Sequence, residues 1–405
     1  AETSLLEGVF TRGDRRLGEV IEDAYRRIEF DTETGGVRSW FDKSLNREMV
    51  DRDSRWRFGS VVHEEVDRAF KGDPREAQYG AIEYTFSNTD PVWRPDWKAT
   101  RRSHAKLRSH RVFDWPDAIV VEQTVEVPGL ASTTTLSFIL PRHENTLEVR
   151  GRWDMGFETW PESMYLLLPF DIPEARVRYD IGGLGIEPER QQLPGTCRDY
   201  FHLQNWVDFS GANFGVTIAT PDNPVAQFGD FHFAHAQKRF KLERALFLGW
   251  ITSNYWVCNF PGHQPGEVRA RYCLRPHAGG YDETAAHRFG LEAAMPCTVQ
   301  NALEAPRPET PLPRTGSLLV LPDLPVLTQQ VLPAAWSGAG EKGILLRLMN
   351  ASDVPQTARI ASASLRVQRA MRCDAFGAAL GELPAKDGAV ELELPARGSM
   401  VVQVL

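Results

Sequence analysis

Cysteine is scarce in this sequence, and its spacing is not that of a disulfide framework or a zinc site. The five cysteines, Cys197, Cys258, Cys273, Cys297 and Cys373, are odd in number, and none belongs to a Cys-x-x-Cys pair. Such a set is typical of free thiols in a reducing compartment. We therefore expect a cytoplasmic protein whose cores need no covalent crosslinks.

Long apolar runs and a strong charge excess are also missing. No stretch of about 18 apolar residues occurs, and the first 30 residues contain no signal-peptide core. The charge balance is mildly acidic, with 46 basic and 54 acidic residues and a net charge of -8. This balance argues against nucleic acid or an anionic membrane as the main partner.

The pattern that dominates the sequence is an alternation with period two. With 405 residues, 42% of them hydrophobic, the chain is long enough for two or three globular domains. In residues 145–155 the odd positions are mostly apolar, and the even positions read Thr, Glu, Arg, Arg and Asp. The same alternation recurs in 121–127, 136–140 and 390–394. Many short half-buried strands separated by turn residues predict an all-β, antiparallel fold.

Proline marks one domain boundary. Residues 305–314 carry four prolines in ten positions, which favours an extended connector. We therefore predict a lead-in segment at 1–24, a large sandwich at 25–304, a linker at 305–314 and a small C-terminal β-sandwich at 315–405. Only the first 28 residues or so show helix-like spacing, and Tyr25–Phe30 is equally compatible with a first strand.

Motifs for metal binding and nucleophilic catalysis are absent from the sequence. The ten histidines form no His-Glu-x-x-His or His-x-Asp arrangement, and the spacing of His232 and His235 would place them on opposite faces of a strand. There is no Gly-x-Ser-x-Gly elbow and no nucleotide-binding loop. We therefore assign no catalytic residue and no metal ligand in this chain.

A basic segment at 93–111 has two tryptophans and seven arginines or lysines against a single aspartate. Aromatic and basic residues together can bind a nucleic acid strand. In an acidic chain, a solvated hairpin or an interdomain face is the better interpretation.

Aromatic, carboxylate and amide residues gather in two later segments, 200–233 and 253–266. Sugars are held by aromatic faces together with carboxylates and amides that bind neighbouring hydroxyls. The candidate carbohydrate-binding residues are Trp206, Asp208, Asn254, Trp256 and Asn259. The alternative is a hairpin whose aspartate caps its own turn and whose tryptophans fill the core.

Several segments, in order, resemble one known family. The opening IEFDTETGGVRSWFDKSLNREMVD (28–51) resembles the start of the β-rich C-terminal half of glycoside hydrolase family 38 α-mannosidases. Residues 165–183, 204–220 and 254–277 resemble motifs of a bacterial branch of that family, and RLMNASDVPQTARI with the closing MVVQVL resembles its last domain. The resemblance spans nearly the whole chain.

This resemblance implies a galactose mutarotase-like supersandwich followed by a small sandwich. In the family, zinc and the catalytic aspartate lie on an N-terminal barrel, so the resemblance implies no cofactor here, with zinc on the missing catalytic domain. The implied partners are that barrel and a glycan. A tyrosine and an arginine that reach the sugar in better-known members match places near Val61 and Gly215, so neither side chain carries over.

The leading hypothesis is therefore a noncatalytic β portion of an α-mannosidase-like glycoside hydrolase, which packs on the barrel and completes the active site. One alternative is a free-standing sugar epimerase of the mutarotase type, with His202, His232 and Glu243 as acid and base candidates. A second alternative is a carbohydrate-binding module, which would bind glycan without any barrel.

Overall fold

The computed structural model describes residues 19–66, 100–233, 237–255, 263–299, 315–323, 325–336, 343–362 and 367–405. The chain forms two compact units. The first comprises the described parts of Ala1–Tyr179 and Ile186–Tyr281, and the second comprises Asp180–Gly185 and the described parts of Asp282–Leu405. None of the helices in these residues is long and apolar enough to cross a membrane.

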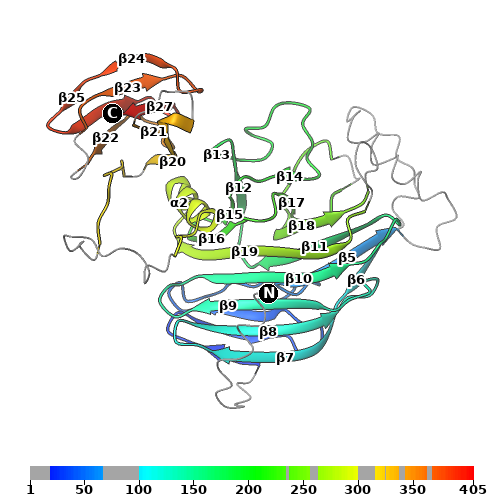
Figure 1. Cartoon of the computed structure of the whole chain (residues 1–405). Coiled ribbons are helices and arrows are strands. Elements are labelled where there is room, and N and C mark those ends of the chain that lie inside the picture. The colour runs from blue at the N-terminus through cyan, green and yellow to red at the C-terminus, as the bar shows by residue number, and fades with distance from the viewer. Residues whose placement is uncertain are drawn as a thin grey trace. The chain divides into compact units, whose positions relative to one another are not determined.

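Two large antiparallel sheets form most of the first unit (Figure 1). Within the described residues, the nine-stranded sheet has the order β13-β12-β15-β16-β19-β10-β9-β8-β7. Its strands are β7 (Lys106–Asp114), β8 (Ala118–Glu126), β9 (Thr134–Pro141), β10 (Leu147–Met155), β12 (Arg176–Ile181), β13 (Leu184–Ile186), β15 (Trp206–Ser210), β16 (Phe214–Ala219) and β19 (Gly266–Ala278).

The six-stranded sheet has the order β14-β17-β18-β11-β5-β6 among the described residues. Its strands are β5 (Ser60–Val66), β6 (Thr100–His104), β11 (Glu162–Phe170), β14 (Phe201–His202), β17 (Val225–Phe228) and β18 (Ala245–Ser253). A small sheet at the start of the chain consists of β1 (Val20–Glu22), β2 (Arg26–Phe30), β3 (Val37–Asp42) and β4 (Arg47–Glu48).

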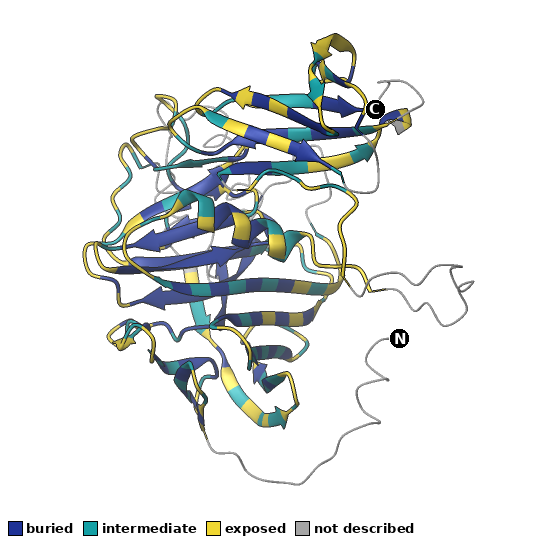
Figure 2. Cartoon of the chain, turned by 90° about the vertical axis from the view of Figure 1, so that its left-hand side faces the viewer, coloured by how far each residue is buried: buried dark blue, intermediate teal, exposed yellow. Residues whose placement is uncertain are grey.

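The main core lies between the two large sheets. It combines side chains of both, such as Phe138 and Val149 of the nine-stranded sheet and Leu166 and Phe247 of the six-stranded sheet. Strand β10 alternates as the sequence predicts, with Leu147, Val149, Gly151 and Trp153 buried and the residues between them turned outward. This alternation appears as dark and yellow bands along strands in Figure 2. The predicted all-β antiparallel sandwich is confirmed.

The helix-like spacing near the N-terminus corresponds to a β-hairpin. Ile21 of β1 lies opposite Ile28 of β2. The Asp23 carboxylate accepts hydrogen bonds from the backbone N–H groups of Tyr25 at 2.8 Å and Arg26 at 2.9 Å, which forms a tight Asx turn. The chain therefore reverses at the point where a helix would continue, and Tyr25–Phe30 opens a strand.

The second unit contains a small sandwich, and its core is formed by residues from both of its sheets, such as Leu346 and Val390. The five-stranded sheet has the order β20-β21-β27-β23-β24, and the three-stranded sheet has the order β22-β26-β25. The strands are β20 (Val326–Pro333), β21 (Ile344–Asn350), β22 (Gln356–Ala361), β23 (Ala370–Cys373), β24 (Ala379–Leu383), β25 (Ala385–Lys386), β26 (Ala389–Leu394) and β27 (Ser399–Val404), with a 3₁₀ turn at Ala334–Trp336. The predicted linker at 305–314 lies outside the described residues.

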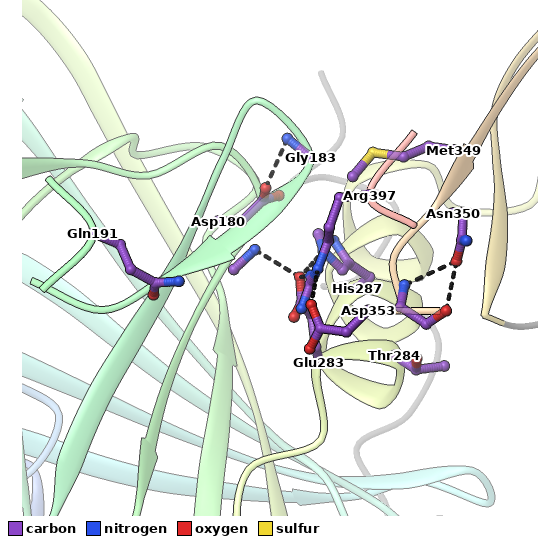
Figure 3. Close-up of polar contacts among 12 residues, drawn as sticks. Asp180, Gly183, Gln191, Glu283, Thr284, His287, Met349, Asn350, Asp353 and Arg397 are labelled. Atoms are coloured by element: carbon purple, nitrogen blue, oxygen red, sulfur yellow. Dashed lines mark hydrogen bonds and ion pairs between the residues drawn. The ribbon is translucent and has the colours of Figure 1, made fainter. Parts of the chain in front are cut away.

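Helix α2 (Glu283–Ala294) is tied to the small sandwich of this unit by one carboxylate (Figure 3). The Glu283 side chain accepts a hydrogen bond from the backbone N–H of Gly185 at 2.9 Å and forms an ion pair with Arg397, on the turn before β27. His287 lies one helical turn further, with Nε2 3.6 Å from the same carboxylate. Arg397 also pairs with Asp353 at 2.8 Å.

Because these contacts depend on the ionised Glu283 carboxylate, we expect the stability of the second unit to fall in acid. Burial tends to raise the pKa of Glu283, but hydrogen bonds from His287, Arg397 and Gly185 outweigh it, and the pKa lies below its usual value of 4.5. The stabilisation is therefore present above pH 4.5 and is lost as the pH falls through the lowered pKa.

We expect Glu283→Gln to lower the melting temperature at pH 7 and to have a smaller effect near pH 3. Calorimetry at both pH values measures this difference. The exposed Glu393 supplies the control Glu393→Gln. Equal losses for Glu283→Gln at the two pH values would contradict the prediction.

Candidate functional site

The six-stranded sheet is buried on both faces. Every residue of β5 and β11 is buried, although alternate side chains point in opposite directions. Val61, Met164 and Leu166 join the core between the sheets, whereas Val62, Tyr165 and Leu167 join a second cluster. The second cluster is rich in aromatic residues and contains no residue of the nine-stranded sheet: Trp56, Val62, Val66, Tyr165, Leu167, Phe231, Phe233, Leu246, Leu248, Trp250 and Tyr255. We call the sheet surface beneath it the aromatic face.

Glu64 of β5 places a carboxylate on this aromatic face. Its side chain is only about 4% exposed. Oε1 accepts hydrogen bonds from the hydroxyls of Tyr255 at 2.9 Å and Tyr165 at 3.3 Å, and Oε2 accepts one from Arg102 Nε at 2.6 Å. A buried carboxylate is tolerated where donors and a cation compensate its lost hydration.

The network extends through amides and hydroxyls. Gln227 donates to the Tyr165 hydroxyl at 3.1 Å, and its Oε1 accepts from the backbone N–H of Phe233 at 2.9 Å and of His232 at 2.5 Å. Trp250 donates its indole N–H to Ser163 Oγ at 3.0 Å. These contacts fix the loop after β17 against the sheet.

The two tyrosines are held as neutral hydroxyls. Burial, and then the negative charge of Glu64, raises the pKa of Tyr165 well above 10. Burial, and to a smaller extent the charge of Glu64, also raises the pKa of Tyr255 well above 10. Both phenols therefore act as hydrogen-bond donors to Glu64, and neither is suited to act as a general base near neutral pH.

A second buried polar pair lies on the opposite face of the same sheet. His63 Nε2 is 2.8 Å from Glu162 Oε2, and its Nδ1 is 3.0 Å from the Pro128 carbonyl oxygen. Both ring nitrogens thus face oxygen acceptors. The side chains are 1% and 5% exposed and contact each other directly, so no sugar ring fits between them.

Trp206 and Asp208 are brought together on one face of β15, in the nine-stranded sheet. Trp206 is fully buried, and its ring centroid lies 5.8 Å from that of Tyr281. Asp208 is 1% exposed and accepts from Thr217 Oγ1 at 2.7 Å, from His277 Nε2 at 3.1 Å and from Ser210 Oγ. Each Asp208 oxygen is therefore engaged by a donor of this chain.

Asn254 lies elsewhere, directly after β18 of the six-stranded sheet. Its Oδ1 accepts from the backbone N–H of Glu162 at 2.6 Å, and its Nδ2 donates to the Trp160 carbonyl at 2.7 Å. The amide thus ties the loop before β11 to the sheet. The remaining two candidate carbohydrate-binding residues, Trp256 and Asn259, lie outside the described residues.

The acid and base candidates of the epimerase alternative do not form a buried pair. His202 on β14 is exposed, and Glu243 is 75% exposed and pairs with Lys241 at 3.3 Å. His232 follows β17 and is partly buried. Among the residues that the structure describes, no group of three or more His, Cys, Asp or Glu side chains is arranged to hold a metal ion.

The described part of the basic segment forms paired strands. Arg102 of β6 pairs with Glu64, and Arg101 pairs with Glu65 at 2.5 Å. Arg108 and Arg111 of β7 form ion pairs with carboxylates of β8. These arginines are thus matched by carboxylates on neighbouring strands, which favours the interpretation of the segment as a structural element over a nucleic acid surface.

The aromatic face was not identified from the sequence. The residues that meet there, Glu64, Arg102, Tyr165 and Gln227, come from four strands far apart in the chain. One usable signal was present: the run SVVHEEV (Ser60–Val66) places three ionisable residues in succession within a strand whose other residues are mostly apolar. Two-sided burial of such a strand requires partners for those groups.

Comparison with known proteins identifies the fold. No protein-family model matches the chain, and no curated protein matches it. Among solved structures, an α-mannosidase from Enterococcus faecalis V583 aligns with 96% of this chain at a TM-score of 0.62 and 11% identity. A glycosyl hydrolase family 38 protein from Enterococcus faecalis aligns with 95% at a TM-score of 0.60 and 12% identity.

The chain therefore has the fold of a part of family 38 glycoside hydrolases, and the resemblance seen in the sequence is confirmed at the level of the fold. It spans only part of those proteins, 42% of the first and 44% of the second. A weaker likeness, with a TM-score of 0.36 over 64% of this chain, relates it to a putative aldose 1-epimerase from Escherichia coli K12.

Proposed function

We propose that this chain is the noncatalytic C-terminal β portion of an α-mannosidase-like glycoside hydrolase. The observation that carries the proposal is the fold likeness to the Enterococcus faecalis α-mannosidase, which extends over 96% of this chain and 42% of that one. In this role the chain packs against a catalytic barrel, orients it and completes its sugar pocket. Of the five candidate glycan contacts, Trp206, Asp208 and Asn254 are buried and engaged within the chain, so the proposed contacts are Trp256 and Asn259, and zinc belongs to the barrel.

The state of the buried carboxylates supports a noncatalytic role. A glycosidase needs two carboxyl groups that flank the scissile bond, about 5–5.5 Å apart in retaining enzymes and further apart in inverting ones. In this chain Glu64, Glu162 and Asp208 are each at most 5% exposed, and each is bound by donors of the chain itself. Their hydrogen bonds hold strands and loops together.

An activity assay tests the proposal. We expect the isolated chain to hydrolyse an aryl α-mannoside no faster than a blank, with or without added zinc. A separate polarimetric assay of α-glucose anomerisation tests the epimerase alternative, for which we expect no acceleration. Turnover in the first assay would contradict the noncatalytic role, and acceleration in the second would favour an epimerase.

A measurement of glycan binding distinguishes a carbohydrate-binding module from the proposed pocket wall. A carbohydrate-binding module binds glycan without a barrel, whereas a pocket wall contributes only part of a site. We expect calorimetric titration of the isolated chain with mannobiose to show no binding at millimolar concentration. Saturable binding that is lost in a Trp256→Ala variant would instead support a binding module.

A further inference from the structure

The exposed margin of the aromatic face carries an arginine and a histidine around one indole. Trp56 lies on the turn between β4 and β5, is 3% exposed and packs edge-on against Phe231 at 5.4 Å between ring centroids. The Arg55 guanidinium carbon lies 4.3 Å from the centroid of Trp56. The imidazole of His104, at the end of β6, lies 4.6 Å from the same indole. Contacts of this kind hold a cation in a defined place.

The charges at this margin are mostly of one sign. Arg57 pairs with Asp31 at 2.9 Å, and Arg102 pairs with Glu64 at 2.6 Å, so both negative groups are already engaged. Arg55 and His104 are exposed, and among the described residues no carboxylate forms an ion pair with Arg55. Burial, and then the positive charges of Arg55 and Arg57, lowers the pKa of His104. The surroundings thus disfavour the protonated imidazole, and a bound anion would favour it.

We propose that the Arg55 guanidinium and the His104 imidazole, with Arg57 beside them, bind a phosphate-type oxyanion. The planar guanidinium of Arg55 supplies parallel N–H donors that match two oxygens of such a group, and the imidazole supplies another donor. Inorganic phosphate and the phosphate group of a phosphorylated sugar offer the same chemistry. The inference does not depend on the proposed glycoside hydrolase function.

The burial of Trp56 favours an oxyanion over a neutral sugar. A sugar ring stacks on an open aromatic face, but only 3% of Trp56 is accessible, and Arg55 and His104 both contact its ring. The exposed groups are thus the Arg55 guanidinium and the His104 imidazole. An anion is the ligand that they can recognise.

Titration of the full chain with inorganic phosphate, followed by NMR of the His104 imidazole and the Trp56 indole N–H, tests the site. We expect saturable shifts at both groups, and a pKa of His104 that rises when phosphate is bound. Arg55→Gln should weaken binding at least tenfold. The control Arg52→Gln removes an exposed arginine of the same turn and should leave binding within twofold.

Glucose 6-phosphate and glucose identify the source of the anion. Binding of glucose 6-phosphate at least tenfold tighter than inorganic phosphate would support a phosphorylated sugar, and equal binding would support free phosphate. Glucose alone should give no shift. The proposal is overturned if phosphate gives no saturable shift at His104 and Trp56, or if Arg55→Gln binds as well as the unaltered chain.

Discussion

Replacement of Gly249 by alanine is expected to destabilise the first unit by ~3 kcal/mol, at the upper end of the cost of overpacking a core. Gly249 lies on β18 and faces the core between the two large sheets. A Cβ atom at this position would overlap the hydroxyl of Tyr272 and lie 2.5 Å from its Cζ. Tyr272 is fully buried on β19, so its ring cannot move aside without disturbing both sheets.

Urea denaturation followed by tryptophan fluorescence measures this loss, because all tryptophans except Trp336 precede residue 282. Gly156→Ala is the matched control, since a Cβ there meets nothing within 4 Å. A Tyr272→Leu background removes the overlapping atoms, and Gly249→Ala should then cost much less than in the unaltered chain. A similar cost in both backgrounds would show that the clash is not the cause.

The strands that are buried on one face could be predicted from the sequence. Strand β10 alternates because one face meets the core and the other meets solvent. Strands β5 and β11 are buried on both faces, so their sequences do not distinguish the core face from the aromatic face. For this reason the sequence alone did not predict the aromatic face.

Helix α2 is the clearest omission of the sequence prediction. Its sequence, ETAAHRFGLEAA, buries only Ala286, His287, Phe289 and Gly290, so the apolar stripe is short and mixed. The start signal was present nevertheless. Asp282 caps the helix and accepts hydrogen bonds from the backbone N–H groups of Thr284 and Ala285. The N-cap residue thus indicates a helix that the hydrophobic periodicity of the sequence does not reveal.

The candidate carbohydrate-binding residues illustrate what residue type alone does not decide. Trp206 and Asp208 were selected because aromatic and carboxylate groups bind sugars. In the structure Asp208 is held by Ser210 of its own strand, by Thr217 of the neighbouring β16 and by His277 of β19, two strands away. Residue type determines which side chains can hydrogen-bond a hydroxyl group. The arrangement of the strands determines whether that hydroxyl belongs to a sugar or to another residue of the chain.

Replacement of Glu64 by alanine is expected to be the most destabilising change at the aromatic face. The substitution leaves Arg102 without its carboxylate and removes the acceptor of two fully buried tyrosine hydroxyls, Tyr165 and Tyr255. Loss of one partner of a buried ion pair costs about 3–5 kcal/mol, because the remaining charge keeps its desolvation penalty. The loss should appear in urea denaturation of the first unit.

The control is Glu126→Ala, whose ion pair with Arg108 has both side chains half exposed. An exposed pair of this kind contributes at most about 1 kcal/mol. A second variant, Glu64→Gln, keeps an acceptor oxygen but loses the charge, and should fall between the unaltered chain and Glu64→Ala. If Glu64→Ala costs no more than Glu126→Ala, the carboxylate is not what holds the aromatic face together. The neutral contacts of Trp56, Trp250 and Phe233 would then have to account for its order.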